Sequence, residues 1–261
     1  LLVLAVACAL VPESPRARAL GALFAGVSLG LATLVRPPSI LWTPLAGLAR
    51  GDRLRALALC ALGVALTVLP WTARNCRVMD GCALVSTNGG SNLLIGTFPD
   101  ARGGYRRPTV EDGCRDVAGE VHRDRCWSRV ALARIGENPA QWLALGARKF
   151  AVTFLGEHDP VSYVRSSRAV SARHPLPVFA TLVCTVAWWA LAVFAWRGGR
   201  LLMASGDPSL AGWTLGGALT VVLTHVTFLG ADRYHLVLVP TLCPAAAVGL
   251  GELLARRGRA A

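Results

Sequence analysis

The stretch that decides the fold is LPVFATLVCTVAWWALAVFAW, from Leu176 to Trp196, which contains no charged residue. About 20 apolar residues in a helix reach across the roughly 30 Å of hydrocarbon in a bilayer. A segment in lipid must satisfy its backbone hydrogen bonds internally, which a helix does. This stretch therefore predicts a transmembrane helix.

Four more apolar blocks have the same character, and two shorter ones accompany them. The long blocks are Ala19 to Val35, Ala56 to Trp71, Ala211 to Gly230 and Leu236 to Leu254, and the short ones are Leu1 to Val11 and Ile40 to Leu48. Of the 261 residues, 16% are charged, whereas soluble domains are about a quarter charged. We predict an all-α, polytopic membrane protein built as a transmembrane helix bundle. Ile40 to Leu48 is expected to be a helix that returns the chain across the membrane, although it is too short to span unaided.

The chain begins at Leu1 in the middle of an apolar run, and no basic segment precedes that run. A secretory signal peptide would carry such a segment. We therefore expect this chain to be the C-terminal part of a longer protein.

Positive charge is concentrated beside the apolar blocks. The net charge is +12, and arginine carries it because Lys149 is the single lysine. The clusters are Arg16 with Arg18, Arg50 to Arg55, Arg197 to Arg200 and Arg256 to Arg259. Basic residues beside spans mark the cytoplasmic face, whereas long loops cross regardless of charge. We therefore predict that these clusters face the cytoplasm and that the chain has no nucleic-acid partner.

This charge pattern divides the chain into three parts. Residues 1–71 are expected to hold the first transmembrane helices, and residues 175–261 the last three. Residues 72–174 are expected to form a large periplasmic or extracellular loop domain of mixed loop and helix. Within it, Val117 to Ile135 and Ala140 to Leu155 have helical spacing of apolar residues. The second of these helices is amphipathic and suits the membrane surface.

Four of the eight cysteines lie in this outer segment, at Cys76, Cys82, Cys114 and Cys126. An even number of cysteines on an oxidising side indicates disulfides. Among the three connectivities we favour Cys76 with Cys82 and Cys114 with Cys126, because each pair brackets a short segment. A zinc site stays open as an alternative, although spacings of six and twelve residues match no usual finger. No metal and no cofactor are assigned.

The outer segment also contains STNGGSNLLIG, from Ser86 to Gly96. Asn88 and Asn92 offer amides, and Gly89-Gly90 would let backbone N–H groups approach a ligand closely. The pattern favours a substrate-facing loop at the lipid surface. A solvated turn between two short strands is the alternative.

Charged residues at the ends of the spans are further candidates. Arg36 ends a span just before two prolines, where it either faces a cavity or snorkels to the interface. Residues Asp232 to His235 join the last two spans in a short turn at the outer surface. That turn is either structural or a subsite in which Arg233 meets phosphate and Tyr234 and His235 meet hydroxyl groups.

Other polar groups are given a structural interpretation. Glu157-His158-Asp159 lies where the chain is expected to re-enter the membrane. Because adjacent loop residues point in different directions, we interpret these three residues as polar groups exposed at the surface. His122 and His174 are expected to be solvated. His225, within a span, is expected to be a hydrogen-bonded residue of the bundle.

Five stretches, in chain order, resemble the polyprenyl-phosphate-sugar glycosyltransferases of the GT-C fold, the protein-mannosyltransferase and aminoarabinose-transferase-like family. They are GLATLVRPPS, LPWTARN, STNGGSNLLIGTFP with the GGY after it, ENPAQWLALGARKF and DRYHLVLVP. The resemblance implies a hexosyl- or pentosyltransferase. It would move a sugar from a polyprenyl-phosphate donor to a glycan, lipid or protein acceptor on the periplasmic side. Thr97 departs from the pattern, which commonly has Asn there.

The resemblance also implies which residues meet the donor phosphate or sugar. The candidates are Arg36, Arg74, Asn88, Asn92, Lys149, Arg233 and Tyr234, to which we add the neighbours Asn75 and His235. The acidic base of such enzymes belongs to the first outer loop, near the N-terminus, so no catalytic residue is assigned here. A transporter or lipid flippase, or a membrane interaction subunit, is the alternative. A transporter predicts polar residues through several spans, and these spans carry few besides His225 and scattered threonines.

Overall fold

The computed structural model describes residues 1–48, 52–158, 175–205 and 209–258, and within these ranges the chain is helical and has no β-strand. Five helical stretches are long and apolar enough to cross a membrane. They are α2 (Pro15–Val35), α3 (Arg53–Val78), most of α8 (Leu176–Ala204), α9 (Ser209–Thr227), and η4 (Asp232–Leu238) together with α10 (Val239–Gly258). The expected all-α architecture is confirmed, and each of the five long apolar blocks falls wholly or mostly in one of these candidate spans.

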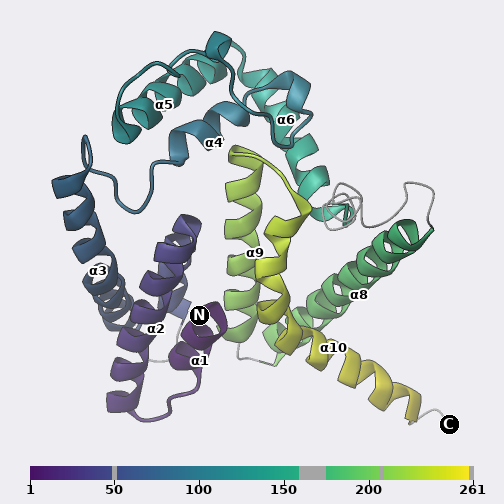
Figure 1. Ribbon diagram of the computed structural model, residues 1–261. Coiled ribbons are helices and arrows are strands. Elements are labelled where there is room, and N and C mark those ends of the chain that lie inside the picture. The colour runs from purple at the N-terminus through teal and green to yellow at the C-terminus, as the bar shows by residue number, and fades with distance from the viewer. Residues whose placement is uncertain (49–51, 159–174, 206–208, 259–261) are drawn as a thin grey trace.

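The helices of the outer segment all lie over one end of the bundle (Figure 1). This group consists of α4 (Gly89–Ile95), α5 (Glu120–Glu137) and α6 (Pro139–Phe154). The beginnings of α2 and α3 and the ends of α8 and α10 lie at the opposite end. The basic clusters belong to those four helix ends, so the charge pattern and the chain direction agree. Arg50, Asp159, His174 and Arg259 lie outside the described residues.

The short return segment differs from the expected α-helix. It is a 3₁₀ helix, η1 (Pro37–Leu48), with a further proline at Pro44. A 3₁₀ helix rises about 2.0 Å per residue, so twelve residues cover about 24 Å instead of the roughly 18 Å of an α-helix. The segment packs against α2, α3 and α9. Its greater rise explains how so short a stretch returns the chain, and its prolines disfavour the regular α-helix.

The spans pack closely through small residues, as membrane helices do. A Cβ atom on Gly26 of α2 would lie 2.0 Å from the carbonyl oxygen of Cys60 in α3. A Cβ atom on Gly198 of α8 would lie 1.8 Å from the carbonyl oxygen of Ala245 in α10. Glycine is therefore required where each of these two helix pairs crosses.

Disulfides and long-range hydrogen bonds stabilise the outer segment, residues 72–158 of the described chain. Disulfides join Cys76 to Cys82 and Cys114 to Cys126, which confirms the favoured pairing. Helix α5 starts after Gly119 and receives its cap from a distant residue. The Asp80 carboxylate accepts hydrogen bonds from the backbone N–H groups of Val121 and His122, at 3.0 and 2.8 Å. The predicted helices of the outer segment are confirmed as α5 and α6.

Candidate functional site

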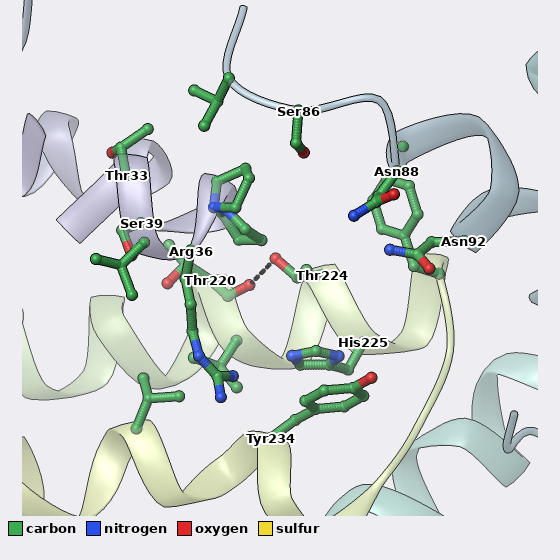
Figure 2. A pocket seen from close by; sticks show the side chains of 18 of the residues that line it. Thr33, Arg36, Ser39, Ser86, Asn88, Asn92, Thr220, Thr224, His225 and Tyr234 are labelled. Atoms are coloured by element: carbon green, nitrogen blue, oxygen red, sulfur yellow. Dashed lines mark hydrogen bonds between the residues drawn. The ribbon is translucent and has the colours of Figure 1, made fainter. Parts of the chain in front are cut away.

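A cavity of about 500 Å³ lies where α2, η1, α9 and η4 meet the chain segment that leads into α4. Figure 2 shows the polar side chains that surround it. The polar lining residues are Thr33, Arg36, Ser39, Ser86, Asn88, Asn92, Thr220, Thr224, His225 and Tyr234. The apolar lining includes Val35, Trp42, Val221, Phe228, Leu229 and Val237. The cavity therefore combines an apolar wall from the bundle with amides and a cation.

Arg36 is the charged residue of this lining. It ends α2, where its backbone N–H still donates to Ala32 but its own conformation is extended. A residue before proline disfavours the α conformation, so Pro37 stops the helix here. The Arg36 side chain then extends toward His225 and Tyr234 (Figure 2). Among the residues that the structure describes, its guanidinium has no ion-pair partner, which leaves it able to bind an anion.

His225 and Tyr234 form a stacked pair in the wall of the cavity. Their ring centroids are 4.3 Å apart and the rings are 9° from parallel. Nδ1 of His225 lies 3.1 Å from the carbonyl oxygen of Leu229. Because a carbonyl can only accept, Nδ1 carries the proton, and Nε2 of the neutral ring is an acceptor. The expectation of a hydrogen-bonded histidine is confirmed, and the residue also lines the cavity, which the sequence interpretation did not anticipate.

Asn88 and Asn92 reach the cavity from α4. They are four residues apart, which places them on one face of the helix, and both are labelled beside the cavity in Figure 2. Neither side-chain amide has a hydrogen-bond partner among the described residues. These two predicted residues are therefore arranged to bind a ligand.

The glycine pair in the same stretch has another role than the one expected. The backbone N–H groups of Gly90 and Ser91 donate to the Asp124 carboxylate of α5, at 2.8 and 3.1 Å. A Cβ atom on Gly90 would lie 1.9 Å from the Asp124 carbonyl oxygen. The Gly90 N–H is thus already bonded, and the stretch is a helix packed on α5. The predicted ligand contact by this N–H and the alternative of a turn between two strands are both wrong.

Arg74 and Asn75 support the wall of the cavity without lining it. The Asn75 side chain is buried, and its amide donates to the carbonyl oxygens of Ala83 and Val85, at 3.1 and 3.3 Å. Arg74 donates to the Asn75 side-chain oxygen at 3.2 Å and lies over the Trp71 ring. Val85 lines the cavity, so these residues fix a segment of its wall.

Lys149 is fully buried away from the cavity. Its Nζ donates to the carbonyl oxygens of Val226 and Thr227, at 3.1 and 3.0 Å. These carbonyls lie at the C-terminus of α9, where a cation is favourable. Burial lowers the pKa of Lys149 to about 8. The lysine therefore binds the end of α9 through the two residues that follow His225.

Arg233 and His235 lie on η4 with different surroundings. Arg233 is exposed, and its guanidinium lies 5.3 Å from the centre of the Tyr234 ring. His235 is fully buried, and its Nε2 lies 2.6 Å from Oε1 of Glu157. Its ring also lies against Trp188, with centroids 3.9 Å apart. Glu157 is 5% exposed, so its interpretation as an exposed polar residue is wrong. Its partner lies 78 residues away along the chain, and the local sequence therefore does not reveal the contact.

Sequence reasoning missed the threonines of the cavity. Thr220, Thr224 and His225 lie on α9, and Thr33 lies on α2. The Thr224 hydroxyl donates to the Thr220 carbonyl oxygen at 2.7 Å, so its lone pairs remain able to accept. The four-residue spacing of Thr220 and Thr224 within an apolar span was a signal of one polar helix face, and His225 follows beside it.

Comparisons of the chain with protein-family models, with curated proteins and with solved structures found no match. The class of protein is therefore defined by the structure itself. It is a helical protein with five candidate membrane spans and a cavity with polar lining at the end of the bundle where α4 to α6 lie.

Proposed function

We propose that this protein is an integral-membrane glycosyltransferase that takes a sugar from a polyprenyl-phosphate-linked donor. The observation that carries the proposal is the position of Arg36. Its guanidinium has no carboxylate partner among the described residues, and it lies in a cavity whose remaining wall is largely apolar. A lipid-linked phosphate joins an anion to an apolar chain, which matches this combination.

The lining suggests an orientation for the donor. The isoprenoid chain packs on the apolar residues of the bundle, among them Trp42, Val221 and Val237. The phosphate meets Arg36, and the sugar hydroxyls meet the amides of Asn88 and Asn92 above it. His225, through Nε2, is placed to hold one further hydroxyl or phosphate oxygen.

The chemistry that follows is displacement at the anomeric carbon. The acceptor hydroxyl attacks that carbon, the bond to the phosphate oxygen breaks, and the polyprenyl phosphate leaves with the electron pair. Arg36 stabilises the negative charge that develops on the departing phosphate. A general base takes the hydroxyl proton. None of the described lining residues is a carboxylate, so the acidic base that the resemblance implies is not assigned among them.

The proposal also includes an orientation in the cell. Basic residues lie at the helix ends opposite α4 to α6, and such residues prefer the cytoplasmic side. The cavity would then open at the periplasmic or extracellular side of a bacterial inner membrane. The acceptor is a lipid, a glycan or a protein.

The test is transfer by the full-length protein in detergent from a panel of radiolabelled polyprenyl-phosphate sugars. Arg36→Gln should lower kcat/KM about 30- to 150-fold, because it removes a charge-assisted contact of about 2 to 3 kcal/mol. The matched control is Arg102→Gln, an exposed arginine that lines no part of this cavity. Absence of donor binding across the panel would contradict the proposal. Movement of donor across vesicles without transfer would favour a transporter.

A further inference from the structure

A second cavity lies beside α4, among the residues of the outer segment. Its volume is about 610 Å³, and its walls come from α4, residues 105–109, residue 115 and the first half of α5. Asn88 and Asn92 line this cavity as well as the first one. A ligand in either cavity would therefore lie against the same two amides.

The outer cavity has an excess of positive charge. Three arginines line it, Arg107, Arg115 and Arg123, against one carboxylate, Glu120. Neighbouring arginines outside the lining are already paired. Arg106 lies 2.8 Å from Asp100 and 2.7 Å from Asp112.

By contrast, Arg107 and Arg115 are exposed and have no ion pair with any residue in the described ranges. The carboxylate of Asp112 is instead bonded to Arg106 and Arg134. Two cations without an ion pair thus border this cavity and are available to bind an anion.

Aromatic and hydroxyl groups complete the lining. The Trp127 indole N–H donates to the Gly113 carbonyl oxygen at 3.2 Å, which fixes the ring. Tyr105 is 66% exposed at the cavity, and Thr87 and Ser91 contribute hydroxyls. Exposed aromatic rings with polar groups around them suit a ligand that has both an apolar face and hydroxyls, as a sugar ring does.

The disulfide between Cys114 and Cys126 holds this arrangement together. It ties the residue before Arg115 to α5, between Arg123 and Trp127. Arg115, Arg123 and Trp127 therefore belong to one cross-linked unit.

We propose that the outer cavity binds the acceptor, and that the acceptor is an anionic saccharide carrying a carboxylate or a phosphate. The acceptor role rests on the proposed transferase function. The shared amides of Asn88 and Asn92 would then bring the acceptor next to the donor sugar in the first cavity.

The experiment measures binding to the full-length protein in uncharged detergent by ligand-observed NMR. The probes are glucuronic acid, glucose 6-phosphate and glucose, so that carboxylate, phosphate and neutral sugar are compared. At least one anionic probe should bind ten-fold or more tightly than glucose. Arg107→Gln combined with Arg115→Gln should reduce that affinity to the level of glucose. Arg102→Gln, an exposed arginine outside both cavities, should leave it unchanged.

Equal binding of all three probes, or unchanged affinity in the double variant, would overturn the inference. Thermal unfolding of the double variant should match the parent protein, since both arginines are exposed. Donor binding is measured in the same samples. Donor binding without any preference for an anionic saccharide overturns the acceptor site and leaves the transferase proposal standing. Preference for an anionic saccharide without donor binding overturns the transferase proposal and supports only the anion site.

Discussion

The imidazole of His235 and the carboxylate of Glu157 meet at 2.6 Å, and neither side chain is more than 6% exposed. Trp188 lies against the imidazole, and its indole N–H donates to the Phe154 carbonyl oxygen at 3.0 Å. The pair thus joins the segment after α6 to η4, under the cover of α8.

Removing one partner of this pair should destabilise the protein strongly. Glu157→Ala leaves Nε2 of a buried imidazole without its partner, while Nδ1 keeps the Thr153 carbonyl oxygen, and breaking a buried pair costs about 3 to 5 kcal/mol. His235→Ala should have a similar effect, and the double variant should lose much less than the sum of the two. Thermal unfolding of all four proteins in one detergent measures this. Additive losses would mean that the two groups are not coupled.

The Asp80 cap makes the outer segment sensitive to acid. Hydrogen bonds from the backbone N–H groups of His122 and Val121 lower the pKa of Asp80 from 3.8 to about 2. A carboxyl whose folded pKa is lowered stabilises the fold above its unfolded pKa and loses that contribution as pH falls through the folded value. We expect stability to fall between pH 4 and 2 in the parent protein. Asp80→Asn should be less stable at pH 6 and show a weaker acid dependence in this range. An identical pH profile for the two proteins would be the contrary result.

Lys149 should give a pH dependence of the same sense, but at high pH. Burial lowers its pKa from 10.5 to about 8, so the folded protein binds fewer protons than the unfolded chain between these values. Stability therefore rises with pH across that window. Lys149→Met should abolish this rise, which thermal unfolding at pH 7 and pH 10 can measure. If the rise persists in the variant, another group is responsible.

Asn88 and Asn92 should affect both substrates, because they line both cavities. Replacing both with Ala should raise the KM for donor and the KM for acceptor, each about ten-fold, as expected for a lost hydrogen bond of about 1 kcal/mol or more. Arg36→Gln should change the KM for donor and leave the KM for acceptor unchanged. Steady-state kinetics with each substrate varied in turn distinguishes the two patterns. Unchanged transfer by the double variant would show that α4 takes no part in the site.

The two disulfides should differ in their effect on the outer cavity. Cys114→Ser with Cys126→Ser should weaken binding of the anionic saccharide probe several-fold, because Arg115 is no longer tied to α5. Cys76→Ser with Cys82→Ser is the matched control and should leave that affinity unchanged, since neither cysteine borders the cavity. Equal effects of the two pairs would indicate a general loss of stability.

Much of the fold could be predicted because its signals are local. A spanning helix is encoded in about 20 consecutive apolar residues, and each disulfide closes a short segment. Helix α4 was missed because its first N–H groups are bonded to Asp124, 33 and 34 residues away. The 3₁₀ form of η1 was also missed, although the prolines that disfavour a regular α-helix there are visible in the sequence.

The candidate site was predictable where polar residues end a span or interrupt an apolar sequence. Arg36, Asn88, Asn92 and Tyr234 were predicted and do line one cavity. Lys149 and His235 come from similar positions in the sequence but are fully buried against α9 and Glu157. Distinguishing the two groups requires knowing which partner each side chain meets, and those partners lie 77 and 78 residues away.

The 3₁₀ form of η1 also limits how this protein can vary. With 3.0 residues per turn, side chains three apart point the same way. Ser39 and Trp42 both line the cavity, and Leu45 lies on the same row near Gly216. Deleting one residue would turn every later side chain by about 120°, whereas deleting three would keep the row and shorten the segment by about 6 Å. We therefore expect only length changes of three residues in this segment to keep Ser39, Trp42 and Leu45 on one row.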